Sequence, residues 1–155
     1  MPIRNLISRN KSAAHVARLR RAGKKVVFTN GVFDILHRGH VEYLAKAKSL
    51  GDVLIVGLNS DASVRRIKGP RRPLQKQTDR AVILLALESV DYVVPFGEDT
   101  PEKLIRRVKP DVLVKGADYK NSEIVGADFV RSYGGAVHRI RLTPGRSTSG
   151  LIKKL

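Results

Sequence analysis

Apolar residues follow two alternating patterns along the chain, which predict alternating strands and helices. The run VLIVGL at residues 53–58 is apolar without interruption, as in a parallel strand covered on both faces. Residues 78–89 instead repeat apolar side chains every three or four positions, which is typical of a helix with one buried face. The continuous runs predict strands at residues 25–29, 53–58, 90–95, 111–116 and 137–142. The helical patterns predict helices at residues 10–22, 41–50, 61–66, 78–89, 101–109, 122–133 and 147–155.

The order of these elements determines the expected fold. Strands that alternate with helices form a parallel sheet with helices on both faces. We therefore expect an α/β protein with a Rossmann-like, doubly wound, five-stranded parallel sheet. Its 155 residues suit a single domain over residues 1–155, in which residues 1–23 are a helical extension. Ligands of such sheets bind beyond the carboxyl ends of the strands, so the loops after the first, fourth and fifth strands are the candidate site.

The charge of the chain narrows the range of partners. Thirty lysine and arginine residues against fourteen acids give a net charge of +16. Much of this charge belongs to a solvated surface, and nucleic-acid binding is the obvious functional alternative. That alternative ranks lower because four Phe, four Tyr and no Trp supply few stacking surfaces, and no zinc-finger, RNP or KH motif is present. Basic residues instead cluster beside glycines at residues 68–73 and 144–149, where small phosphate-bearing ligands would use them.

The sequence carries no signal of export or membrane insertion. The N-terminus lacks the apolar segment of a signal peptide, and no apolar run approaches the length that crosses a membrane. The absence of cysteine excludes disulfides, thiolate metal sites and cysteine nucleophiles. We therefore expect a cytoplasmic protein without a membrane partner.

The segment TNGVFDILHRGH at residues 29–40 carries the strongest chemical signal. It lies between the first strand and the following helix, so that His37 and His40 stand at a helix N-terminus. Unpaired backbone N–H groups and the helix dipole favour anions at such a terminus. One histidine alone would usually be structural, but two of them around Gly39 indicate contacts with phosphate. No nearby His-x-x-Glu or cysteine pattern supplies a third ligand, so no metal site is expected.

Three further basic segments allow both a structural and a functional interpretation. Lys68, Arg71 and Arg72 are most simply cations of a solvated loop. Arg80 lies at a helix start, where a cation is unfavourable, which indicates either a ligand contact or a salt bridge to a nearby acid. The segment GRSTS at residues 145–149 is either a capped helix start or a phosphate site. We favour the phosphate site, because an arginine followed by three hydroxyl residues suits phosphate oxygens.

The motifs taken in order resemble one known family. NGVFD at residues 30–34 followed by HRGH at residues 37–40 resembles the cytidylyltransferase-like branch of the HxGH nucleotidyltransferases. Within that family, the downstream motifs are most similar to adenylyltransferases that form ADP-heptose. These motifs are NSD at 59–61, KG and RP within 68–73, DR at 79–80, VD at 90–91, EDTP at 98–101, PDVLVKGADY at 110–119 and RSTS at 146–149. The resemblance runs from about residue 10 to the C-terminus.

The resemblance implies a reaction and its partners. ATP and D-glycero-β-D-manno-heptose 1-phosphate would give ADP-heptose and pyrophosphate, for lipopolysaccharide core or capsule precursors. ATP is then a substrate, Mg²⁺ accompanies its triphosphate, and a homodimer is expected. Members of the family often carry a fused sugar kinase, so a heptose-phosphate kinase on a separate chain is expected here. The closest alternative is a CTP-dependent enzyme that acts on glycerol 3-phosphate or a similar phospho-alcohol.

The resemblance also implies roles for individual residues. The two histidines would donate hydrogen bonds to the nucleotide phosphates and to charge that develops in the transition state. The catalytic set is His37, His40, Lys68 and Arg146, with Lys68 on the acceptor phosphate and Arg146 on the phosphate tail of ATP. The nucleotide-binding set is Asn30, Gly31, Val32, Phe33, Gly39, His40, Lys115, Gly116, Asp118, Arg146, Ser147 and Thr148. The acceptor-binding set is Asp34, Lys68 and Arg80.

Overall fold

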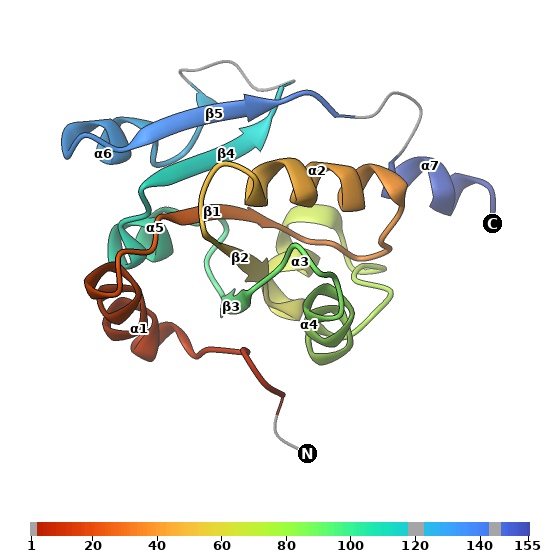
Figure 1. Cartoon of the computed structure of the whole chain (residues 1–155). Helices are drawn as coiled ribbons and strands as arrows, with labels where there is room; N and C mark the ends of the chain where they lie inside the picture. The colour runs from red at the N-terminus through yellow and green to blue at the C-terminus, as the bar shows by residue number, and fades with distance from the viewer. Residues whose placement is uncertain (1–2, 118–122, 143–146) are drawn as a thin grey trace.

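Five parallel strands form the sheet, in the order β3-β2-β1-β4-β5 (Figure 1). The computed structural model describes residues 3–117, 123–142 and 147–155. The strand β1 (Val26–Gly31) lies at the centre, between β2 (Val53–Asn59) and β4 (Val112–Gly116), while β3 (Tyr92–Phe96) and β5 (Ala136–Ile140) form the edges. The predicted doubly wound, five-stranded parallel sheet is therefore confirmed.

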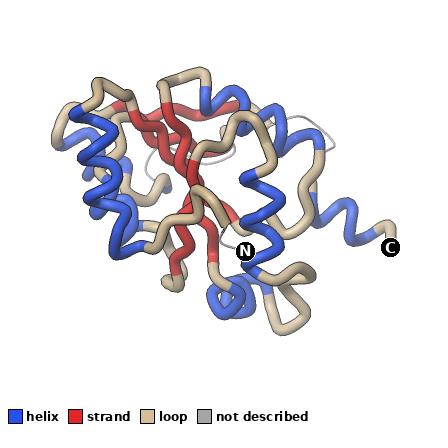
Figure 2. Tube along the Cα trace, turned by 60° about the horizontal axis from the view of Figure 1, so that its bottom comes forward, coloured by secondary structure: helices blue, strands red, loops and turns tan. Residues whose placement is uncertain are grey.

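Helices cover both faces of this sheet (Figures 1 and 2). Apolar residues of α2 and α4 pack on one face, and those of α1, α5 and α6 pack on the other. None of the helices in the described part of the chain combines the length and the apolar character needed to cross a bilayer. The helices are α1 (Arg9–Arg21), α2 (Arg38–Lys48), α3 (Asp61–Lys68), α4 (Gln77–Leu85), α5 (Glu102–Val108), α6 (Ala127–Ser132) and α7 (Thr148–Lys153).

The alternation of side chains along the strands produces two separate core layers. Val26 and Phe28 of β1 join the layer beneath α1 and α5, whereas Val27 between them joins the layer beneath α2. Every residue of β2 is buried, because this strand has neighbours on both edges and helices on both faces. The uninterrupted apolar run in the sequence is the consequence of this position.

Two predicted helices differ most from their bounds in the structure. The helix predicted at 122–133 begins at Ala127, after Gly126 in a left-handed conformation with φ 85°. The helix predicted at 78–89 ends at Leu85, so its last apolar positions belong to the turn before β3. Both differences lie at helix ends, where local periodicity gives little information on the boundary.

The N-terminal extension is more than a helix. The backbone N–H of Ile7 donates to the carbonyl of Val93 at 2.9 Å, and the N–H of Val93 donates to Asn5 at 3.1 Å. The segment before α1 therefore pairs in parallel with the edge strand β3. This pairing satisfies backbone groups of an otherwise open sheet edge, and it holds α1 against the sheet.

Candidate active site

A cavity of 520 Å³ lies at the carboxyl ends of the strands, where β1 meets β4. This is the switch point of the fold, since the chain proceeds from β1 to β2 in one direction and later from β4 to β5 in the other. The predicted site residues that line the cavity are Asn30, Gly31, Val32, Phe33, Asp34, His37, Gly39, His40, Lys68, Lys115, Gly116, Ser147 and Thr148.

Three predicted site residues are not among those lining residues. Asp118 and Arg146 lie outside the described residues. Arg80 is described, is 1% exposed and does not line the cavity.

The two histidines stand where the sequence predicts them, at the start of α2. His37 is the N-cap, and His40 lies in the first turn. Their rings stack with centroids 3.8 Å apart, and the edge of Phe33 meets the His40 ring at 5.2 Å. A side chain at Gly31 would collide with this arrangement, because its Cβ would lie 2.8 Å from the Phe33 ring.

His40 is neutral at physiological pH. Burial, together with the adjacent His37, lowers the pKa of His40 to about 4. The backbone N–H of His37 points at Nδ1 of His40 at 3.4 Å, which assigns Nδ1 as an acceptor and places the ring proton on Nε2. A neutral imidazole in this tautomer can donate one hydrogen bond to a phosphate oxygen without a change of charge.

Lys115 brings a cation to the same cavity from β4. Its ammonium donates to Oδ1 of Asn30, at the end of the neighbouring strand β1. Burial lowers the pKa of Lys115 to about 8. Within the described part of the chain, no carboxylate forms an ion pair with it, so two of its three N–H groups are available to a ligand.

Asp34 is buried, and the protein itself uses its carboxylate. It accepts the backbone N–H groups of Leu74 and Gln75 at 2.8–2.9 Å and Nε of Arg72 at 2.7 Å. Burial alone would raise the pKa of Asp34, but these backbone and guanidinium contacts lower it, so the group is ionised. Asp34 thus anchors the loop between α3 and α4 to the histidine segment.

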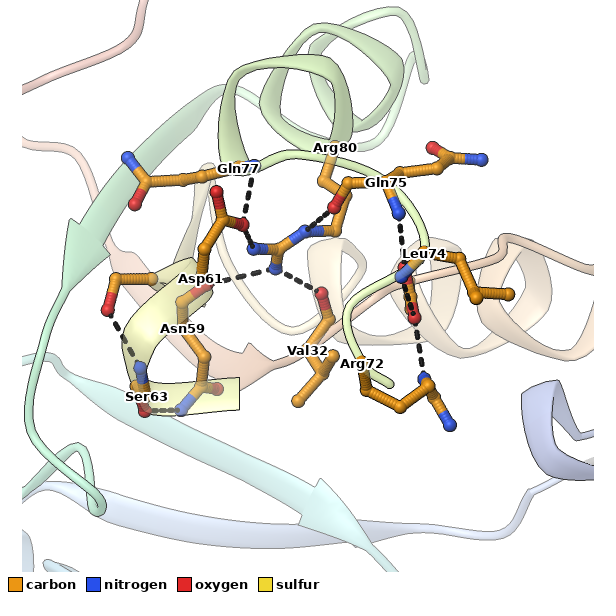
Figure 3. A network of polar contacts seen from close by, with 11 residues as sticks. Val32, Asn59, Asp61, Ser63, Arg72, Leu74, Gln75, Gln77 and Arg80 are labelled. Carbon is orange, nitrogen blue, oxygen red and sulfur yellow. Dashed lines mark hydrogen bonds and ion pairs between the residues drawn. The ribbon is translucent and has the colours of Figure 1, made fainter. Parts of the chain in front are cut away.

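Arg80 belongs to a buried network, which corrects the expectation that it contacts the acceptor (Figure 3). Its guanidinium donates to the carbonyls of Val32, Asn59 and Gln75 at 2.8–3.0 Å and to Asp61 at 2.7 Å. These four contacts leave at most one of its five N–H groups for anything else. The sequence had indicated a salt bridge as the alternative to a ligand contact, and the structure forms one with Asp61.

Lys68 and α7 complete the walls of the cavity. Lys68 is the last residue of α3 and is exposed, next to Gly69 with φ 103°. Oγ1 of Thr148 donates to the carbonyl of Ile35 at 2.9 Å, which ties the start of α7 to the histidine segment. Oγ of Ser147 accepts the N–H of Gly150 at 2.9 Å and caps the helix.

Sequence reasoning missed several lining residues. Arg72 is most simply a solvated cation by its sequence, yet it lines the cavity, and Thr100 and Pro101 line it although they are not among the predicted site residues. Tyr43 was unassigned, and it both lines the cavity and bonds Thr29 beneath it at 2.8 Å. No local pattern places these side chains at the cavity, because each reaches it through tertiary packing.

Comparison with known proteins identifies the family. Residues 28–141 match the family described as Cytidylyltransferase-like. The bifunctional protein HldE of Wolinella succinogenes is 56% identical over 150 residues, which cover 97% of this chain and 31% of that protein. The bifunctional protein HldE of Geobacter metallireducens is 61% identical over 133 residues, which cover 86% of this chain and 27% of that protein. The chain thus spans less than a third of the length of these relatives.

Two solved structures are also similar to this chain. The lipopolysaccharide core biosynthesis protein from Thermoplasma volcanium GSS1 is similar with a TM-score of 0.64 and 32% identity, over 78% of this chain and 98% of that one. Pantoate-beta-alanine ligase from Francisella tularensis, solved with beta-gamma ATP and beta-alanine, gives a TM-score of 0.60 at 18% identity, over 97% of this chain and 73% of that one, which is a likeness of fold alone. The family model matches most of the length of this chain, and the paired histidines lie at the carboxyl edge of the sheet. This chain therefore belongs to the cytidylyltransferase-like family of nucleotidyltransferases.

Proposed function

We propose that this nucleotidyltransferase joins ATP and D-glycero-β-D-manno-heptose 1-phosphate to give ADP-heptose and pyrophosphate. The observation that carries the proposal is the gathering of His37, His40, Lys68 and Lys115 around one cavity, in a chain whose ordered motifs resemble ADP-heptose-forming enzymes. The relatives called HldE and the lipopolysaccharide core biosynthesis protein support the same assignment. The product would serve lipopolysaccharide core or capsule synthesis.

The reaction needs positioning and charge neutralisation more than acid–base chemistry. A phosphate oxygen of the sugar attacks the α-phosphorus of ATP in line, and pyrophosphate leaves on the opposite side. The nucleophile is already an anion, so no general base is required. His40 is suited to donate a hydrogen bond to the phosphoryl oxygens, and Lys115 to offset the charge that they carry.

The two substrates would occupy opposite sides of the histidines. We place the acceptor phosphate beside Lys68 and the triphosphate tail beside Ser147, Thr148 and Arg146. Lys68 lines the cavity at the end of α3. Thr148, at the start of α7, lines it beside the histidine segment, to which it is hydrogen-bonded. Arg146 and the nucleoside-binding role of Asp118 rest on the resemblance, since both residues lie outside the described part.

Mg²⁺ would accompany the triphosphate. The described residues bring no group of three His, Cys, Asp or Glu together, and the buried carboxylate in the cavity, Asp34, is bonded to the protein. The residues present therefore fit a cation coordinated mainly by phosphate oxygens and water. Bound in that way, Mg²⁺ supplies neutralisation of phosphate charge.

Pyrophosphate release tests the proposal. ATP and CTP are each offered with a panel of sugar 1-phosphates and with glycerol 3-phosphate. The expected result is release with ATP and the manno-heptose 1-phosphate, well above every other pair. A preference for CTP with glycerol 3-phosphate would instead establish the alternative substrates. We also expect a homodimer and a heptose-phosphate kinase that supplies the acceptor, which light scattering and a coupled assay with such a kinase would test.

A further inference from the structure

Arg72 differs from its neighbour in the loop between α3 and α4. The side chain of Arg72 is only 16% exposed and lines the cavity, whereas Arg71 is exposed to solvent. The motif RP at residues 72–73 includes Arg72 and leaves out Arg71, but the loop sequence alone makes both most simply solvated cations. A guanidinium that turns away from water needs partners that replace its hydration.

Asp34 is the partner on one side of Arg72. Nε of Arg72 donates to Oδ2 of Asp34 at 2.7 Å, and the side chain of Asp34 is fully buried. The same carboxylate holds the backbone of Leu74 and Gln75, so the position of the loop and the orientation of the guanidinium are fixed together. Figure 3 shows that the side chain of Arg72 is directed away from Arg80 and from the buried network of Arg80 contacts.

The other side of Arg72 has no partner among the residues that the structure describes. In residues 3–117, 123–142 and 147–155, no hydrogen bond or ion pair engages its two terminal nitrogens. Arg72 therefore presents the outer edge of its guanidinium to a cavity that Lys68 also lines. Two parallel N–H groups on that edge match two oxygens of a phosphate group.

We infer that Arg72 binds the acceptor phosphate in a bidentate way, with Asp34 as the residue that positions it. The inference rests on the proposed function and deepens it, because it assigns the acceptor site a directional donor in addition to the point charge of Lys68. An acceptor phosphate monoester is a dianion that must approach the triphosphate of ATP. Two cations beside that dianion reduce the repulsion between the substrates.

A purely structural salt bridge makes different predictions from a phosphate contact. Loss of a structural bridge would loosen the loop, lower Tm and weaken both substrates together. Loss of a phosphate contact would raise the KM of the acceptor alone. The variants Arg72→Gln and Arg72→Lys separate these roles, and Arg71→Gln is a matched control because it removes the same charge from the exposed neighbour.

Steady-state kinetics with ATP and D-glycero-β-D-manno-heptose 1-phosphate, together with thermal unfolding, provide the test. Arg72→Gln should raise the acceptor KM by about ten- to a hundred-fold, the range for a lost charge-assisted contact, with little change in the KM for ATP. Arg72→Lys should lie between Arg72→Gln and the unaltered protein, since it keeps the charge but loses the fork. Arg71→Gln should match the unaltered protein. Equal increases in both KM values, or identical kinetics for Arg72→Gln and Arg71→Gln, would overturn the inference.

A binding measurement distinguishes failure of this inference from failure of the proposed function. Inorganic phosphate is titrated calorimetrically into the unaltered protein and Arg72→Gln, each saturated with a non-hydrolysable ATP analogue. Weaker phosphate binding by Arg72→Gln supports the inference even if the heptose phosphate proves to be the wrong acceptor. Equal binding by both proteins overturns it, whichever sugar phosphate releases pyrophosphate.

Discussion

Arg80 and Lys115 are both basic side chains near the carboxyl edge of the sheet, but the protein uses them in opposite ways. Arg80 is 1% exposed, and its guanidinium contacts three backbone carbonyls and Asp61. Lys115 is half-buried, contacts Asn30, and has no carboxylate partner in the described part of the chain. The fold supplies hydrogen-bond acceptors to Arg80, whereas Lys115 keeps N–H groups that no residue in the described part of the chain accepts.

The difference shows how charge is divided between stability and ligand binding. Around Arg80 the contacts join the histidine segment, the end of β2 and the start of α4, so the charge stabilises the walls of the site. Around Lys115 burial without a counter-ion raises the free energy of the ammonium form and lowers its pKa to about 8. A bound phosphate would supply the missing counter-ion, which makes an incompletely satisfied cation a better candidate for ligand contact.

Replacement of Arg80 should have the largest effect, and it should act on folding. Arg80→Met would leave the carbonyls of Val32, Asn59 and Gln75 without their donor. Since each unsatisfied buried group costs about 1–3 kcal/mol, the free energy of unfolding should fall by about 3 kcal/mol or more. Urea unfolding measures it, with Arg66→Met as the control at an exposed ion pair worth roughly 1 kcal/mol or less. If Arg80→Met were as stable as the control and only the acceptor KM rose, Arg80 would be a ligand residue and the comparison would fail.

Replacement of either histidine should come next, and it should act on turnover. His37→Ala and His40→Ala should each lower kcat by about 10²–10³, the range for loss of one transition-state donor. The free energy of unfolding should change little, because both rings belong to the cavity wall. His138→Ala, at an exposed position of β5, is the matched control. Near-normal kcat in both cavity variants would remove the histidines from the mechanism.

The sequence predicts the sheet well because its strands carry local signals. The run at residues 53–58 is apolar throughout, and the structure buries every residue of β2. The pairing of Leu6 with Val93 has no such signal, since it joins residues far apart in the chain. The start of α6 was likewise not predictable, because it depends on Gly126, which is left-handed and lies where a Cβ would collide with the side chain of Ile105.

The same limit applies to the site. The histidines and glycines of residues 29–40 form a contiguous motif, so both their place and their surroundings were predictable. The roles of the arginines were not, because their chemistry depends on what packs beside them. Arg71 and Arg72 are adjacent in sequence, yet only Arg72 meets a buried carboxylate. The position of Arg80 at a helix start indicates either a ligand contact or a salt bridge, and its true partners carry no local signal because its four protein acceptors come from separate segments.

Replacement of Lys68 should have a smaller effect, confined to one substrate. Lys68→Ala should raise the KM of the sugar phosphate roughly tenfold and leave the KM of ATP nearly unchanged, since one charge-assisted contact is lost at an exposed position. Arg65→Ala, an exposed cation of α3 that does not line the cavity, is the control. A rise in the KM of ATP alone would move Lys68 to the nucleotide side and leave the acceptor to Arg72.

Replacement of Lys115 should produce only a small change in stability, and the sign of that change is the informative part. Burial lowers the pKa of Lys115 from 10.5 to about 8, so the folded protein binds this proton less tightly than the unfolded chain does. The penalty is complete below about pH 8 and is relieved as the pH rises toward 10.5. Lys115→Met should therefore raise Tm at pH 7, where a gain of about 1 kcal/mol would correspond to about 2–4 °C, and the gain should shrink at higher pH.

The Lys115→Met variant should also lower kcat/KM for ATP, whereas kcat/KM of the unaltered enzyme should decline as Lys115 loses its proton above about pH 8. Scanning calorimetry at pH 7 and pH 9.5, with a pH–rate profile of both proteins, measures these effects. A lower Tm for Lys115→Met at pH 7 would mean that the fold uses Lys115 as it uses Arg80, and the contrast between the two cations would disappear.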